Sequence, residues 1–165
     1  EKDILSLMAA KPLIDEIATM DPRIFQEREM ELRTDLLHLD LPMRVALDAG
    51  QNTLFLNFEN MRIRNVVDVD MVRQAVENVC FAHPEKVDVI ANYDDCRIDD
   101  ALVNVWAEMV SGLEERFYRK ISRYAGSAFM RMKLREVFPE HRSHIFETVQ
   151  QADEYLKRGE FKTEV

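Results

Sequence analysis

The sequence predicts an α/β domain, in which a hairpin followed by βαβα units forms a small, mostly parallel sheet with helices packed on it. Three observations lead to this class. Two β-rich runs flank a turn at positions 48–51, later segments carry apolar residues at helical spacing, and further β-rich runs alternate with those segments. Strands that alternate with helices need crossover connections, which make neighbouring strands parallel.

The hairpin comprises residues 44–59. Its turn contains Gly50, where a positive φ is easily adopted. In the second run Leu54 and Leu56 share one face, and Phe55 gives the opposite face an apolar side chain as well. A strand that is apolar on both sides is typical of a sheet covered by other elements on both faces.

The first predicted helix follows the hairpin. Asp68 or Asp70 can cap its start, and it ends near Pro84. This helix is indicated by apolar residues at helical spacing, namely Val72, Ala75, Val76 and Val79. After the helix, residues 86–92 predict a buried strand.

A longer second helix begins at Asp99 or Asp100. Its buried stripe includes Trp106 and Phe117, so we expect both side chains in the core. Residues 120–124 predict a short third strand of the parallel set.

Two shorter helices complete the chain. Ser127 can cap the first of them, which stops at Pro139. Ser143 can start the last helix, and Gly159 ends it. No internal repeat or low-complexity tract appears in the sequence.

Composition narrows the class of protein. The chain has 165 residues, a formal net charge of -9, 47% apolar and 32% charged residues, so we expect a folded domain that binds neither nucleic acid nor membranes. No apolar run is long enough to span a bilayer, and the first residues lack the pattern of a signal peptide. Two cysteines, Cys80 and Cys96, are too few for a disulfide framework, which favours a reduced, cytoplasmic setting.

The chain divides by composition into two parts. Residues 1–42 hold three of the five prolines, Pro12, Pro22 and Pro42, and only short apolar clusters. We therefore predict a connecting arm over 1–42 and the α/β domain over 43–165.

The candidate ligand or partner site lies where parallel strands end, because ligands gather at the carboxyl edge of such sheets. Two readings stay open. Residues 119–135 form a basic segment. In the interpretation that we favour, Arg123 and Arg131 of this segment neutralise Asp94 and Asp95 in an internal network. In the other, the segment binds an anion at the helix start. The aspartates match no metal-binding pattern, so no metal is expected. The candidate residues are Asn92, Tyr93, Asp94, Asp95, Arg123, Tyr124, Ser127, Arg131 and Lys133.

The order of elements resembles that of the STAS family, the fold of anti-sigma-factor antagonists. In that family the loop after the corresponding strand often carries a phosphorylatable Ser or Thr at a helix start. This chain has Asp94, Asp95 and Cys96 there. The resemblance therefore implies a site with fixed negative charge in place of a phosphorylation switch.

The arm resembles another family. Asp3-Ile-Leu-Ser-Leu-Met, then Pro12, then Met20-Asp21-Pro22-Arg23-Ile24-Phe25, is similar to the closing stretch of bacterial acyl-CoA:acetate/3-ketoacid CoA-transferases. The family commonly continues with a Pro-Met-Gly-Leu turn, which residues 28–32 replace here. The segments 92–94 and 122–134 look like the C-terminal extension found on a subset of these enzymes.

The resemblance implies a transferase parent whose substrate is coenzyme A, and the rest of that polypeptide as partner. Those enzymes use a glutamate nucleophile near glycine-rich loops. Here Glu59 precedes Asn60, but the four glycines are isolated, so we do not assign the catalytic role to Glu59. The chain itself is expected to be inactive and to bind no cofactor.

The sequence thus favours an accessory C-terminal domain that serves assembly or regulation of a CoA-transferase. One alternative is an independent STAS-type regulatory module that binds a protein. Another is a small CoA- or nucleotide-binding domain that uses residues 123–133. Association into a homo-oligomer stays open.

Overall fold

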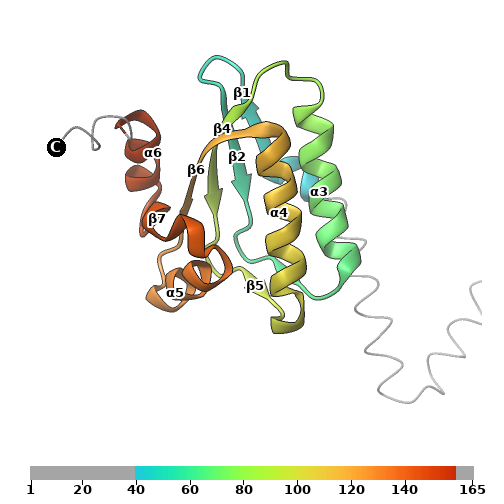
Figure 1. The fold of residues 1–165 in the computed structure, drawn as a ribbon, viewed down its shortest axis with the longest axis vertical. Coiled ribbons are helices and arrows are strands. Elements are labelled where there is room, and N and C mark those ends of the chain that lie inside the picture. Colours follow the sequence, from blue (N-terminus) through green and yellow to red (C-terminus); the bar gives the residue numbers. More distant parts are fainter. Residues whose placement is uncertain (1–39, 159–165) are drawn as a thin grey trace, which may run out of the picture. The chain divides into compact units, whose positions relative to one another are not determined.

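The computed structural model describes residues 40–158, and Figure 1 shows the fold. Most of the predicted arm, residues 1–39, lies outside this part of the chain, and residues 40–44 are helical. The strands are β1 (Val45–Asp48), β2 (Thr53–Asn57), β3 (Arg62–Ile63), β4 (Val87–Asn92), β5 (Arg97–Ile98), β6 (Tyr118–Tyr124) and β7 (Ile145–Phe146). The helices are α3 (Val66–Cys80), η1 (Asp100–Leu102), α4 (Val103–Phe117), α5 (Ala128–Val137), η2 (Pro139–His144) and α6 (Val149–Arg158).

The main sheet has five strands in the order β1-β2-β4-β6-β7. β1 runs antiparallel to β2, and the other neighbouring pairs are parallel. β3 and β5 form a separate two-stranded parallel sheet. The predicted α/β class, with a hairpin followed by a mostly parallel sheet and helices packed on it, is confirmed.

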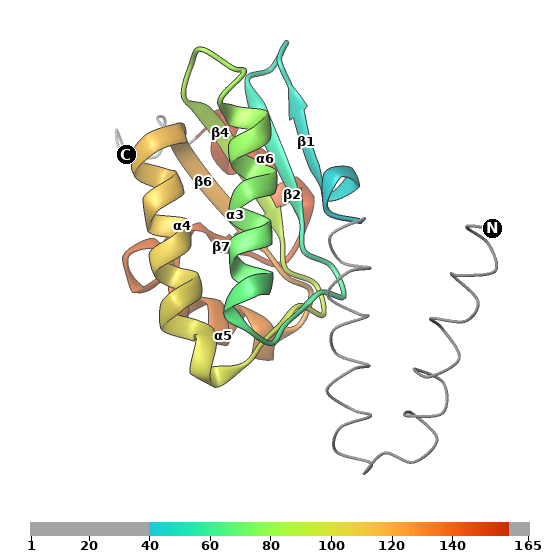
Figure 2. The ribbon, with the colours of Figure 1, turned by 90° about the vertical axis from the view of Figure 1, so that its right-hand side faces the viewer.

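Helices lie on both faces of the sheet, but β2 is covered on one face only, since Phe55 on its other face is exposed. α3 and α4 lie side by side on one face, as Figure 2 shows. α6 lies on the other face, where Ala152 and Leu156 pack against Ile90 of β4. Because side chains alternate along a strand, Val89 points to the opposite side, toward α3 and α4, and β4 is buried on both faces.

The hairpin forms as predicted, but Gly50 does not take the positive φ. Asn52 does so, at φ 53°. Asparagine tolerates this conformation better than most residues, because its short polar side chain finds local partners. Here the Asn52 amide donates to the carbonyl of Lys86 at 2.7 Å, and its oxygen lies 2.6 Å from His83 Nε2. The turn is therefore fixed to the segment that leads into β4.

The cap of α3 differs from the prediction that Asp68 or Asp70 provides it. Asn65 is the capping residue and accepts a hydrogen bond from the Asp68 backbone N–H at 2.9 Å. The Asp68 carboxylate in turn accepts from the backbone N–H of Arg64 at 3.0 Å. Two backbone donors at the helix start are thus satisfied reciprocally, as in a capping box.

The stripe of α4 is buried at its middle and not at its end. Trp106 has no exposed surface, and its indole N–H donates to the Tyr93 hydroxyl at 3.2 Å. Phe58 meets the Trp106 ring edge to face, with centroids 5.3 Å apart. Phe117 is only half-buried and packs against the exposed ring of Phe81, so its predicted place in the core is wrong.

One prediction for the C-terminal third of the chain is wrong, namely the residue that starts the last helix. The predicted third strand is confirmed as β6, and Ser127 caps α5 by accepting from the Met130 N–H at 3.3 Å. Ser143, however, lies within η2 and does not start the last helix. Thr148 performs this role for α6, because its hydroxyl accepts from the N–H of Gln151 at 3.2 Å.

The two aromatic residues of α4 should respond differently to truncation. Trp106→Ala removes a fully buried ring, and we expect it to lower the free energy of unfolding by about 3–5 kcal/mol. Phe117→Ala at the half-buried rim should cost about 1 kcal/mol. Urea denaturation of both variants measures these losses, and equal losses would contradict the burial of this helix.

Candidate functional site

The ends of β4 and β6 meet at the carboxyl edge of the sheet, as predicted. Asn92 pairs with Tyr124 across the two strands. The Asp94 carboxylate accepts a hydrogen bond from the Gly126 N–H at 2.5 Å, and the Asn92 side chain accepts from the Asp94 N–H at 2.9 Å. The two loops after these strands are therefore tied together by the side chain of Asp94.

The side chains of Tyr93 and Asp95, two other predicted residues of this edge, are placed differently. The side chain of Tyr93 points into the core, and burial raises the pKa of its hydroxyl to about 12. Asp95 is exposed and has a positive φ of 53°. The structure thus brings Asn92, Asp94 and Tyr124 together. The Tyr93 backbone N–H also joins this edge by donating to the Tyr124 carbonyl at 2.9 Å, but its side chain does not.

The cations that follow hold backbone carbonyl groups. Arg131 donates from Nη1 to the carbonyls of Ala125 at 2.8 Å and Gly126 at 2.9 Å. Lys133 donates to the carbonyl of Ile98 at 2.8 Å. These contacts fix the turn before α5 and connect α5 to β5.

Arg123 faces a glutamate and Arg131 holds backbone carbonyls, so the predicted network, in which both neutralise the aspartates, is wrong. The Arg123 side chain is 1% exposed and lies on the face of β6 that α4 covers. Its guanidinium carbon lies 3.7 Å from the centroid of the Phe138 ring, and Nη2 lies 3.8 Å from Glu114 Oε1. Because side chains alternate along a strand, Arg123 points to the same side as Ile121, into the core.

The carboxylate of Glu114, which faces Arg123, also lines a polar pocket. His141 Nε2 lies 3.1 Å from Glu114 Oε1, so the carboxylate stands between the imidazole of η2 and the buried guanidinium. The pocket has a volume of about 520 Å³, within the range of small-molecule sites. Its walls come from α4, β6, η2 and α6, with Ser111, Glu114, Glu115, Tyr118, Arg119, Lys120, Ile121, His141, His144 and Tyr155 as lining residues.

A second imidazole lines this pocket. His144 Nε2 lies 3.0 Å from the Tyr155 hydroxyl, and the two rings stack with centroids 4.4 Å apart. Burial lowers the pKa of His144, and the nearby charges of His141 and Arg123 lower it further. The neutral imidazole is therefore the form that the fold favours.

Sequence reasoning missed this pocket. His141 and His144 are three positions apart in the sequence and belong to no recognisable ligand motif. Glu114 and Tyr155 are distant from them in the sequence, and no motif joins the four. These side chains come together only in the folded protein, where α4, η2 and α6 all line the pocket.

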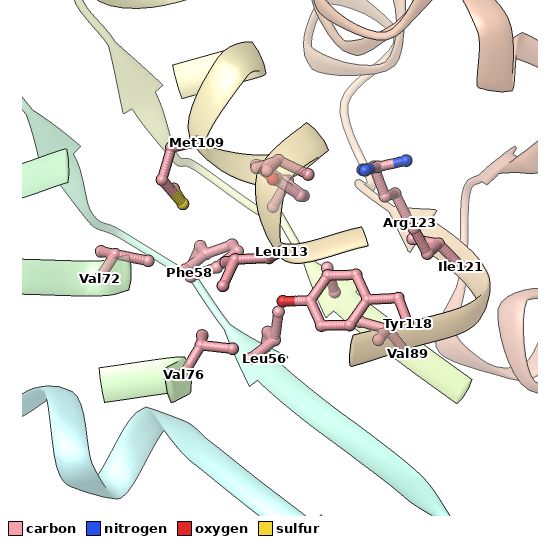
Figure 3. A pocket seen from close by; sticks show the side chains of 13 residues that line it. Leu56, Phe58, Val72, Val76, Val89, Met109, Leu113, Tyr118, Ile121 and Arg123 are labelled. Carbon is pink, nitrogen blue, oxygen red and sulfur yellow. The ribbon is translucent and has the colours of Figure 1, made fainter. Parts of the chain in front are cut away.

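Two buried polar atoms in this region lack a hydrogen bond within the described part of the chain, Arg123 Nη1 and Glu114 Oε1. A buried charge without its full set of partners reduces stability. Arg123 also borders a separate interior cavity of about 20 Å³, enough for about one water molecule. Figure 3 shows apolar side chains around that cavity, among them Leu56, Val76 and Leu113.

The site offers little for nucleophilic or metal chemistry. Burial raises the pKa of the Cys80 thiol to about 11 and that of Cys96 to about 12, so neither is a thiolate at neutral pH. Over residues 40–158, no group of three or more His, Cys, Asp or Glu side chains is placed to hold a metal ion.

No protein-family model, curated protein or solved structure matches the chain. The class that the structure defines is an α/β domain with a mixed, mostly parallel sheet. Among the described helices, none is long and apolar enough to cross a membrane.

Replacing Arg123 tests its position in the core. Arg123→Met leaves Glu114 without its buried counter-charge, and we expect a loss of about 3 kcal/mol in the free energy of unfolding. Arg123→Lys should not restore stability, because an ammonium group cannot lie flat on the Phe138 ring.

Lys157→Ala is the matched control, because Lys157 forms an exposed ion pair with Asp153 on α6. That variant should lose at most about 0.5 kcal/mol. Equal stabilities of the Arg123 and Lys157 variants in chemical denaturation would show that Arg123 is not a core residue.

The lowered pKa of His144 predicts a dependence of stability on pH. The folded state favours neutral His144, so its contribution is complete above the reference pKa of 6.5 and is lost as the pH falls through the lowered value. His144→Phe keeps a ring beside Tyr155 but cannot titrate. We therefore expect the free energy of unfolding to fall less in the variant than in the parent when the pH is lowered from 7.5 to 5, a range of about the titration span of histidine. An identical loss in both proteins would contradict the assignment.

Proposed function

We propose that residues 40–158 form an accessory domain of an acyl-CoA:carboxylate CoA-transferase, which serves the assembly or regulation of that enzyme. The resemblance of residues 3–25 to the closing stretch of such enzymes supports the parent. The partner is then the remainder of the transferase polypeptide, and coenzyme A is the substrate of the parent. The two free, buried cysteines fit a cytoplasmic protein.

The observation that carries the accessory role is the environment of Glu59. It lies exposed on a turn after β2, where its carbonyl accepts from Arg44 at 2.8 Å and its N–H donates to the Asn57 side chain at 3.1 Å. A glutamate nucleophile needs backbone donors that stabilise the acyl oxyanion at close approach. No glycine flanks this turn, and Asn60 takes its positive φ of 60°.

The contacts at the sheet edge also support a role in assembly or regulation. Asp94, Arg131 and Lys133 are used to join loops to one another, so the predicted ligand residues act within the fold. Arg123 is buried and cannot contact a ligand from solvent, which disfavours a CoA site built on residues 123–133.

The reading frame upstream of residue 1 tests the proposal. It should encode a transferase chain with a glutamate nucleophile and glycine-rich loops. In that protein, deletion of residues 40–165 should alter the assembly state or the regulation of activity and should leave the glutamyl-thioester chemistry intact. An upstream frame that encodes an unrelated protein would reject the proposal.

The chain of 165 residues should be catalytically silent. We expect no CoA transfer from acetyl-CoA to carboxylic acids above background, because Glu59 lacks an oxyanion site. Hydroxylamine trapping followed by mass spectrometry detects any glutamyl thioester. A label on Glu59 that is lost in Glu59→Gln would show that the domain carries a catalytic glutamate after all.

A further inference from the structure

The outer surface of α3 and the end of α4 carry an ordered ladder of charges with alternating sign. Asp70 pairs with Arg73, Arg73 with Glu77, and Glu77 with Arg116 of α4 at 3.0 Å. Asp70, Arg73 and Arg116 remain between 37% and 50% exposed, and Glu77 between the two arginines is 14% exposed. The order of charge along the surface is thus negative, positive, negative, positive.

Apolar side chains lie at both ends of this ladder. Val66 and Val67, at the start of α3, are 60% and 54% exposed. Phe81, directly after the helix, is 65% exposed and meets the Phe117 ring at a centroid distance of 5.3 Å. Exposed apolar and aromatic side chains at both ends of the helix can contribute contact area to an interface.

Arg116 is held by two aromatic rings on one side and by a carboxylate on the other. Its guanidinium lies over the rings of Phe81 and Phe117, 5.2 Å and 4.6 Å from their centroids. The pair with Glu77 fixes its other side. A preordered arginine beside exposed aromatic rings is the composition enriched at the energetic centres of protein interfaces.

The ladder is complementary to itself when it is reversed. Asp70 and Glu77 are separated by about 10 Å along the helix, since each residue rises about 1.5 Å. A two-fold axis near residue 75 places Arg73 opposite Glu77 of the second copy and Asp70 opposite Arg116 of the second copy. The same rotation brings Phe81 within about one helical turn of the exposed valines of the other chain. Such a contact is isologous, and it closes after two subunits.

We propose that the outer face of α3, together with Arg116 and Phe81, is the interface of a homodimer in which the two α3 helices pack antiparallel. Figure 2 shows α3 and α4 side by side on one face of the sheet, with their outer surfaces toward the viewer. Charge order selects the second copy and its orientation, and the apolar ends supply the contact area. This inference does not depend on the transferase parent.

Charge reversal in the full chain tests the interface. Arg73→Glu alone places the new carboxylate against Glu77 of the second copy, and Glu77→Arg alone places two guanidinium groups together. Each variant should raise the dimer dissociation constant by on the order of tenfold or more in analytical ultracentrifugation. An equimolar mixture of the two should form a heterodimer, because each chain then presents the charges that the other lacks. The double variant Arg73→Glu with Glu77→Arg should dimerise as the parent does.

Phe129→Glu is the control, because Phe129 is 71% exposed on α5, away from this face. It should leave dimerisation unchanged, whereas Phe81→Glu should weaken it. Circular dichroism confirms that each variant is folded, and rescue in the mixture excludes misfolding as the cause. A chain that stays monomeric at millimolar concentration overturns the proposal, and so does a dimer that neither reversal weakens.

Discussion

The fold depends on one charge that is buried inside it. Arg123 comes from β6, lies on the Phe138 ring between α5 and η2 and faces Glu114 of α4, so it joins three segments of the chain at one point. A guanidinium in this position must be compensated, and the compensation fixes α4 and η2 relative to the sheet. The pocket beside it exists because η2 is held there through His141.

The period of apolar residues determined what the sequence could predict. β4 and α4 are long enough for their patterns to be unambiguous, and the alternation of strands with helices fixed the class of fold. The short strands β3, β5 and β7 have two residues each, which is too few for a pattern to show. Caps were the other weak point, since Asn65 and Thr148 compete with neighbouring aspartates and serines that fit the same rule.

The candidate site was partly predictable for the same reason. Parallel strands bring their carboxyl ends to one edge, which correctly placed Asp94 beside the turn at Gly126. The direction of each side chain was not available, however. Arg123 differs from Arg131 only by the face on which strand or helix geometry places it, and this decides that one is buried and the other reaches the turn. The polar pocket depends on contacts between η2 and α6, which no local pattern encodes.

The short length of α6 has a consequence for local unfolding. Only Ala152 and Leu156 anchor it as fully buried residues, and a helix of 10 residues has little stability of its own. Its backbone amides should therefore exchange with deuterium through a subglobal opening, at a lower free energy than those of β4. In that open state Ile90 meets water while α3 and α4 stay on their face. The free energy of local opening would then be lower on the α6 side of the sheet than on the side of α3 and α4.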